Sequence, residues 1–206
     1  MDARGRKLIR TPYPAPMRTV LGGLLTTALL LAGCGDDGAD PSAEQADGAF
    51  ESPTEALGDA DEGIEGVQAF RVHYPVGEGP PHREGDIEYG LRPPVGGLHD
   101  QVPSECGFYD EPVRDENAGH SLEHGAVWLS YATDLAEEDV EVIRDLARDN
   151  DEVLAAPYEG LDPGLAVVAT AWARQLDLES VDDPRLADFV AEYQNGDQHP
   201  EPGVGC

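Results

Sequence analysis

The sequence predicts an α+β fold, in which a small mixed or antiparallel sheet carries two helices in the order β-α-β-β-α. Three observations lead to this prediction: apolar runs of strand length, two stretches with apolar residues at helical spacing, and a segment rich in Pro and Gly, residues 73–119, in the first half of the part expected to fold. We expect both helices on one face of the sheet, because that arrangement buries their apolar sides together. The long Pro/Gly-rich loop region should pack on this layer.

Three apolar runs are expected to be strands. Residues 126–131 (AVWLSY) are apolar and β-prone, and residues 153–156 form a second run that Pro157 stops. Residues 165–173 (LAVVATAWA) carry no charge, which is typical of a strand at the centre of a sheet.

The first helix is expected to start at Asp134. Its side chain can cap the free amides, and Glu137 three residues later completes a capping-box pattern. The apolar residues that recur at helical spacing, and so predict its buried face, are Ala136, Val140, Ile143 and Ala147.

The last helix has signals at both ends. Asp183 is the predicted N-cap, Pro184 occupies the first helical position, and Gly196 stops the helix. Its apolar stripe consists of Leu186, Phe189, Val190 and Tyr193.

The chain begins with a predicted signal peptide of the lipoprotein type, residues 1–33. The uncharged run 20–33 follows basic residues and is too short to span a bilayer. It ends in Leu-Ala-Gly before Cys34, which resembles the lipobox of bacterial lipoproteins, where the Cys is acylated. The resemblance implies a cell-membrane protein that is anchored through Cys34 and faces the extracytoplasmic side. An ordinary secretory signal is the alternative.

Residues 34–66 are expected to be a disordered acidic tether that follows the lipidated Cys34. Large apolar residues are too few in this segment to offset its ordering entropy. The single folded domain is then expected to cover residues 67–206.

The charge of the protein excludes nucleic acid as a partner. The 206 residues include 42 Asp and Glu but only 13 Lys and Arg, a net charge of -29. Such a surface repels phosphate backbones and anionic headgroups. We interpret the excess of acids as solvated surface, and no protein partner follows from it.

Two cysteines remain once Cys34 is assigned to lipid. Cys106 and Cys206 form an even pair in an oxidising compartment, so a disulfide is expected. A thiolate metal ligand or a redox group at Cys106 is the alternative, although the sequence lacks a CxxC motif.

Four histidines predict a metal site. His120 and His124 share a face whether their segment is helical or extended, and His82 and His99 lie in loops that need an anchor. Imidazole suits Zn or Cu, whereas a Met-rich Cu(I) site is excluded because Met occurs only at the N-terminal end of the chain. We expect His99, His120 and His124 as ligands and His82 as a fourth.

The segment from His120 to His124 also matches the HxxEH pattern of a group of zinc peptidases. In that pattern the two His bind Zn and Glu123 is the general base. Those peptidases are much larger and need a further acidic ligand, so we rank a hydrolase below a binding site.

The same motifs resemble a bacterial domain-of-unknown-function family, number 3105. The resemblance rests on His82, Pro93 to His99, Cys106 to Tyr109, His120 to Gly125 and the closing segment up to Cys206. It implies a secreted or membrane-attached protein and no particular activity. His73 and His199 fall outside the family motifs, and we leave them out of the site.

Two main hypotheses follow from the sequence. The first is an extracytoplasmic lipoprotein with a His-rich Cu or Zn site, with Glu123 supporting the ligands. The second is a metal-free structural or interaction module in which a disulfide joins Cys106 to Cys206.

Overall fold

The computed structural model describes residues 50–60, 63–73, 82–201 and 204–206. The predicted signal peptide and Cys34 lie outside these residues. No helix in the described segments is long and apolar enough to span a bilayer.

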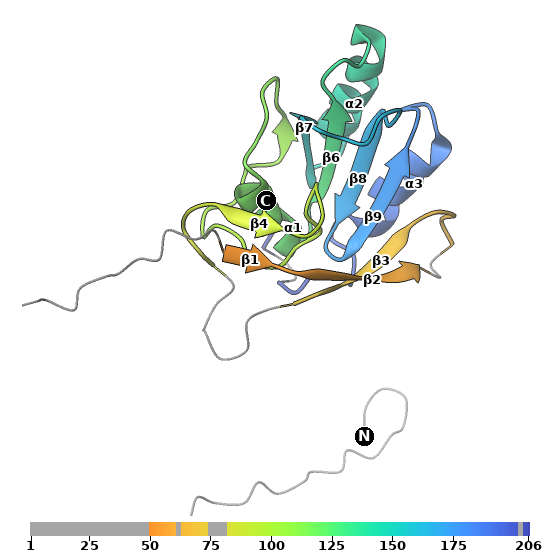
Figure 1. The fold of residues 1–206 in the computed structure, drawn as a ribbon. Helices are drawn as coiled ribbons and strands as arrows, with labels where there is room; N and C mark the ends of the chain where they lie inside the picture. The colour runs from red at the N-terminus through yellow and green to blue at the C-terminus, as the bar shows by residue number, and fades with distance from the viewer. Residues whose placement is uncertain (1–49, 61–62, 74–81, 202–203) are drawn as a thin grey trace, which may run out of the picture. The chain divides into compact units, whose positions relative to one another are not determined.

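The centre of the fold is a mixed sheet of seven strands in the order β2-β3-β9-β8-β6-β7-β5 (Figure 1). β5–β7 and β6–β7 are parallel pairs, and the other pairs are antiparallel. The strands are β2 (Thr54–Asp59), β3 (Gln68–Val72), β5 (Gly107–Phe108), β6 (Val127–Ala132), β7 (Val153–Tyr158), β8 (Val167–Ala171) and β9 (Arg174–Leu178). A separate parallel pair is formed by β1 (Phe50–Ser52) and β4 (Ile87–Tyr89).

In the described part of the chain, three helices cover the two faces of the sheet: α1 (Asp115–Glu123), α2 (Glu137–Asp149) and α3 (Pro184–Tyr193). α2 and α3 pack on one face, where their apolar residues meet Val127 and Leu129 of β6. α1 packs on the other face, where Leu122 contacts Trp128 of β6. The α+β class and the shared face of α2 and α3 are therefore confirmed, while α1 is an additional helix that the sequence did not predict.

The start and the apolar stripe of the last helix agree with their predictions, whereas Gly196 does not have the predicted role of stopping the helix. Asp183 is the N-cap, and its carboxylate accepts a hydrogen bond from the amide of Arg185 at 3.0 Å. All four residues of the predicted stripe are buried. The helix ends at Tyr193, and Asn195, with a φ of 52°, turns the chain away before Gly196.

The start of α2 differs from its prediction. The helix begins at Glu137 after Ala136, without a side-chain cap, so the role given to Asp134 is wrong. Ile143 and Ala147 are buried as expected, but Ala136 is exposed because it precedes the first helical turn.

Two strand boundaries also differ. Pro157 lies inside β7, opposite Tyr131, and does not stop the strand. Its missing N–H costs little, because β5 pairs with β7 only at Leu154 and Ala155, and Pro157 lies beyond that edge. The run 165–173 is β8 followed by a turn, and β8 is the central strand, as expected. β9, which was not predicted, follows directly.

The fold begins earlier than expected. β1 and β2 lie in the segment that we expected to be a disordered tether, so this prediction is wrong for residues 50–59. The hydroxyl of Ser52 is buried and accepts a hydrogen bond from the amide of Leu98 at 3.0 Å. This contact ties the segment to the loop region ahead of α1.

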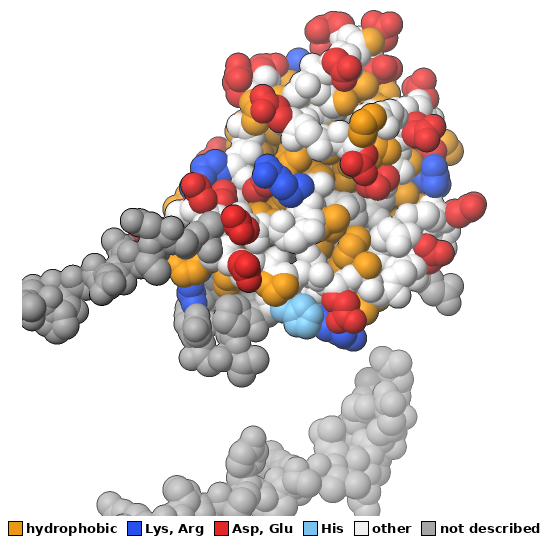
Figure 2. All heavy atoms as spheres, viewed as in Figure 1, with side chains coloured by type: hydrophobic (Ala, Val, Ile, Leu, Met, Phe, Trp, Pro, Cys, Tyr) orange, Lys and Arg blue, Asp and Glu red, His pale blue; other side chains and the backbone are white. Residues whose placement is uncertain are grey.

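Acidic side chains are spread over the face of the molecule drawn in Figure 2, with few Lys or Arg among them. Glu141, Asp145 and Asp149 of α2 are among the solvent-exposed acids. These acids are in contact with water, whereas Asp100, Glu116 and Glu123 are buried.

Candidate metal centre

Four side chains converge under the loop region: His82, His99, His120 and Glu123. One ligand atom from each lies within 4.8 Å of the others. His99 Nε2 is 2.9 Å from Glu123 Oε2, and His82 Nε2 is 3.7 Å from the same oxygen. His99, His120 and Glu123 are buried, whereas the His82 side chain is 34% exposed and forms the outer edge of the group.

His82 and His99 come from two loops that are joined at these residues. An isolated parallel β-bridge pairs them, and the amide of Arg83 donates to the carbonyl of His99 at 2.8 Å. Their rings lie next to each other, with centroids 4.9 Å apart. The bridge therefore brings two residues that are 17 positions apart in sequence to the same place.

His120 and Glu123 lie in the last turn of α1. Residues three apart on a helix project to the same side, so both face the two loop histidines. The helix is held against the loop by bonds from the amides of Asp100 and Ser104 to its carbonyls, at 3.1 and 3.2 Å. Gly119 permits this approach, since a Cβ at that position would lie 3.3 Å from the Cβ of His99.

Two glycines before His99 shape the loop. Gly96 and Gly97 have φ values of 120° and 105°, which L side chains rarely adopt. A Cβ on Gly96 would lie 2.8 Å from the ring of Trp172, and one on Gly97 would collide with the hydroxyl of Ser52. Only glycine fits at either position.

The hydrogen bonds of two histidines fix their tautomers. His99 Nδ1 lies 2.8 Å from the carbonyl of Gly97, and His120 Nδ1 lies 2.7 Å from that of Asp100. A carbonyl can only accept, so Nδ1 carries the proton and Nε2 keeps a lone pair. Metal-binding histidines commonly show this arrangement, in which the ring nitrogen that does not bind the metal donates to a carbonyl.

The buried polar atoms at the centre of the group lack hydrogen bonds. His82 Nε2, His99 Nε2 and Glu123 Oε2 have no hydrogen-bond partner, despite their proximity. Buried polar atoms are almost always satisfied in folded proteins. Both imidazole nitrogens lie close to the same carboxylate oxygen, so a cation could be shared among the three side chains.

The surroundings lower the pKa of both His120 and Glu123. Burial lowers the pKa of His120, and the neighbouring histidines lower it further, which favours the neutral ligand form. Burial alone would raise the pKa of Glu123, but the close His99 and the charges of His120 and His82 outweigh it and lower that pKa. A His120 that favours its neutral form beside a Glu123 that favours its ionised form suits the binding of a cation.

His124 does not belong to the group, contrary to the prediction. Its Nδ1 bonds the carbonyl of Gly205 at 3.0 Å, and its Nε2 lies 3.0 Å from His120 Nε2 and 3.6 Å from Glu201. His124 is the C-cap of α1, where it turns toward the C-terminal tail. The group of close side chains contains Glu123 in the place predicted for His124.

The two histidines left out of the site lie in different surroundings. His73 is exposed, with its Nε2 3.8 Å from Glu55. His199 is buried, and its Nδ1 lies 3.3 Å from the carbonyl of Glu123. His199 thus supports the backbone of the group without supplying a ligand atom.

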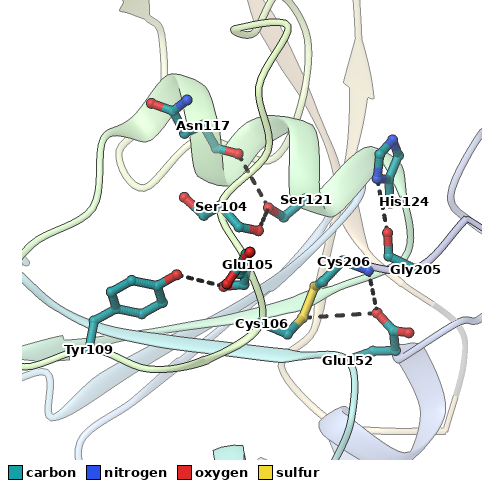
Figure 3. Close-up of a disulfide and its surroundings, with 10 residues drawn as sticks. All are labelled: Ser104, Glu105, Cys106, Tyr109, Asn117, Ser121, His124, Glu152, Gly205 and Cys206. Carbon is teal, nitrogen blue, oxygen red and sulfur yellow. Dashed lines mark hydrogen bonds between the residues drawn. A yellow bond between two sulfur atoms is a disulfide. The ribbon is translucent and has the colours of Figure 1, made fainter.

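A disulfide joins Cys106 to Cys206, as expected, and closes a separation of 100 residues (Figure 3). The Cα atoms are 5.4 Å apart, an ordinary distance for a disulfide. Glu152 accepts a bond from the amide of Cys206 at 2.8 Å. The tail is thereby fixed beside His124.

A family comparison covers this whole region. Residues 82–206 match the model of a family described as a protein of unknown function (DUF3105). No curated protein and no solved structure matches the chain. The match begins at His82 and ends at Cys206, so it includes the four converging side chains and the disulfide. It spans more than half of the chain, and the protein therefore belongs to this family.

Proposed function

We propose that the protein is an extracytoplasmic lipoprotein that binds one metal ion at His82, His99, His120 and Glu123. The observation that carries this proposal is that four potential ligand atoms lie within 4.8 Å of one another, and that His82, His99 and Glu123 each have a buried side-chain atom without a hydrogen-bond partner. The ion would join the two loops to the last turn of α1. Its role would be to hold the loop-rich half of the fold in place.

The arrangement of protons supports a cation at this position. Nδ1 of both His120 and His124 faces a carbonyl, so neutral rings leave no proton between the two Nε2 atoms, which lie 3.0 Å apart. The facing lone pairs repel each other. A cation held close to this pair of nitrogens would offset the repulsion.

The donor set favours Zn²⁺, with Cu²⁺ second. Three imidazoles and one carboxylate contain no sulfur, so Cu⁺ is a poor match. Tetrahedral Zn²⁺ places its donors about 3.4 Å apart, given Zn–N and Zn–O bonds of about 2.1 Å. The present distances range from 2.9 Å up to the 4.8 Å limit, so shifts below about 1 Å would complete the site.

Four protein ligands and deep burial favour a structural site over a hydrolase. A catalytic zinc keeps a position open for water, and its general base stands outside the ligand set. Glu123 lies within the set, and His82 is the one member with a substantially exposed side chain. The HxxEH segment of this chain thus lacks the division of roles that a zinc peptidase needs.

Elemental analysis tests the metal site directly. We expect the protein, purified without a histidine tag, to contain about one equivalent of zinc or copper. His99→Gln should lose the ion, while His73→Gln, the same change at an exposed histidine, should keep it. Chelation should lower the melting temperature of the wild type and leave that of His99→Gln unchanged.

A metal-free wild type that melts at the same temperature with and without chelator would refute the metal site. The metal-free module would then be the better interpretation, because the disulfide alone would hold the tail. Loss of stability on reduction, without any response to metal, is the result expected for that module.

Membrane attachment through Cys34 is a separate part of the proposal. It is supported by the leader sequence and by the disulfide, which suits an oxidising compartment. Cells that express the protein should incorporate labelled palmitate into it and retain it in the membrane fraction. Cys34→Ala should abolish both, and a protein that stays in the membrane fraction without Cys34 would contradict this anchor.

A further inference from the structure

We propose that reduction of the disulfide creates a second metal site, composed of the thiolates of Cys106 and Cys206 and the carboxylate of Glu152. Their sulfur and oxygen atoms all lie within 4.8 Å of one another. The site would take a thiophilic divalent ion such as Zn²⁺. It is separate from the His82 group and does not depend on the function proposed for it.

Two of the three ligands are placed by the sheet and not by the disulfide. Cys106 directly precedes β5, which pairs with β7 through Gly107 and Leu154. Glu152 directly precedes β7, and its carbonyl accepts a bond from the amide of Val127 at 2.9 Å. Both residues should therefore keep their positions when the sulfur–sulfur bond breaks.

The third ligand has anchors other than the disulfide. The amide of Cys206 donates to Glu152 Oε2 at 2.8 Å, and the carbonyl of Gly205 accepts from His124 Nδ1 at 3.0 Å (Figure 3). The same Glu152 oxygen lies 3.9 Å from the sulfur of Cys106. These contacts keep Cys206 near Cys106 after reduction.

A reductant and a metal ion can reach the site from solvent. Cys206 is exposed, and Cys106 and Glu152 are partly exposed. Two thiolates and a carboxylate leave a fourth position open to water, and thiolates are good ligands for Zn²⁺ and similar ions.

A dithiol can reduce the disulfide between Cys106 and Cys206. The dithiol gives two electrons and two protons to the disulfide and becomes a disulfide itself, leaving Cys106 and Cys206 as thiols. A divalent ion then displaces the two thiol protons and forms two metal–sulfur bonds. Reoxidation would release the ion.

Titration with Co²⁺ or Cd²⁺ tests this inference on the full protein. The protein reduced with a phosphine should bind one more equivalent than the oxidised protein and show a thiolate-to-metal charge-transfer band in the ultraviolet. Imidazole and carboxylate ligands give no such band, so His99→Gln should keep it. A reduced wild type without the extra equivalent or the band would overturn the inference.

Two matched substitutions test whether Glu152 is a ligand of the reduced site. Glu152→Gln keeps an acceptor for the amide of Cys206 but should weaken the reduced site about tenfold or more. Glu105→Gln makes the same change next to Cys106, at an exposed residue outside the group, and should have little effect. Equal affinities in the two variants, as expected if reduction unfolded the chain and exposed free thiols, would also refute the site.

Discussion

His99 and Gly119 lie in direct contact, with only 3.3 Å between the Cβ of His99 and the place of a Cβ on Gly119. The distance is shorter than an ordinary carbon contact, so any side chain on Gly119 must push the loop away from α1. The position of a fully buried histidine thus depends on the absence of one methyl group on a neighbouring helix.

Gly119→Ala should weaken metal binding without destabilising the metal-free fold. Alanine favours a helix by about 1 kcal/mol over glycine, which offsets the cost of moving the loop by a few tenths of an ångström. We expect the metal-free melting temperature to stay within a few degrees and the affinity for Zn²⁺ to fall about tenfold or more. Calorimetric titration and a thermal melt of the same variant measure the two effects. Unchanged affinity would show that metal binding does not depend on the close approach of His99 to Gly119.

Glu123 and His124 should respond differently to the same type of substitution. Glu123→Gln removes a donor of the group and should lose most of the bound metal. His124→Gln alters only a neighbour of His120 and should retain close to one equivalent. Elemental analysis of both variants checks the assignment. The reverse result would restore the ligand set predicted from the sequence.

Asp115 should make stability depend on pH in the acidic range. Burial raises its pKa, although Tyr158, which donates a hydrogen bond to it, and Arg92 lower it in part. A raised carboxyl pKa means that the folded state holds its proton above the unfolded pKa of about 3.9. Its contribution to stability is therefore greatest at low pH and declines as pH rises through that value to the folded pKa.

Asp115→Asn removes this titration. The stability of the variant relative to the wild type should increase as pH rises through the same window and then become constant. Urea unfolding at a series of pH values measures the difference, in which the other titrating groups largely cancel. A difference that stays constant from pH 3 to 7 would show that the pKa of Asp115 is not raised.

Removal of the disulfide should cost considerable stability. Cross-linking over about 100 residues limits the unfolded chain, and the chain-entropy estimate is about 4.7 kcal/mol. We expect the free energy of unfolding of Cys106→Ser/Cys206→Ser to be lower by about 2 to 5 kcal/mol in guanidinium titrations without added metal. A loss below about 1 kcal/mol would mean that the tail contacts alone hold the C-terminus.

Elements with complete local signals could be predicted from the sequence. α3 has a capping Asp, an N-terminal Pro and an apolar stripe, and the structure contains each of them. α1 lacks such signals, since only Ala118 and Leu122 are apolar in its nine residues and no side chain caps it. Its stability comes from packing on Trp128 and from bonds to the loop, which are long-range features.

The candidate site, too, could be predicted only in part from the sequence. The sequence predicted that His82, His99 and His120 lie close together, and the structure contains this arrangement. The prediction rested on the family motifs and on the loops around His82 and His99, which need an anchor. The choice between Glu123 and His124 depends on where α1 ends. The helix includes Glu123, and His124 at its C-cap turns to the tail, a boundary that the sequence alone leaves open.

Alternate residues of β6 belong to the two hydrophobic clusters on opposite faces of the sheet. Val127 and Leu129 face α2 and α3, while Trp128 between them faces α1 and the loop region. Deletion of a single residue within β6 would exchange these faces, moving Trp128 out from under α1 and bringing small or aliphatic residues in its place. The turn around Gly160 and Gly164 has open space at both glycines, so changes of chain length would be tolerated there. A protein engineer who wishes to insert a reporter sequence should therefore choose this turn and leave the length of β6 unchanged.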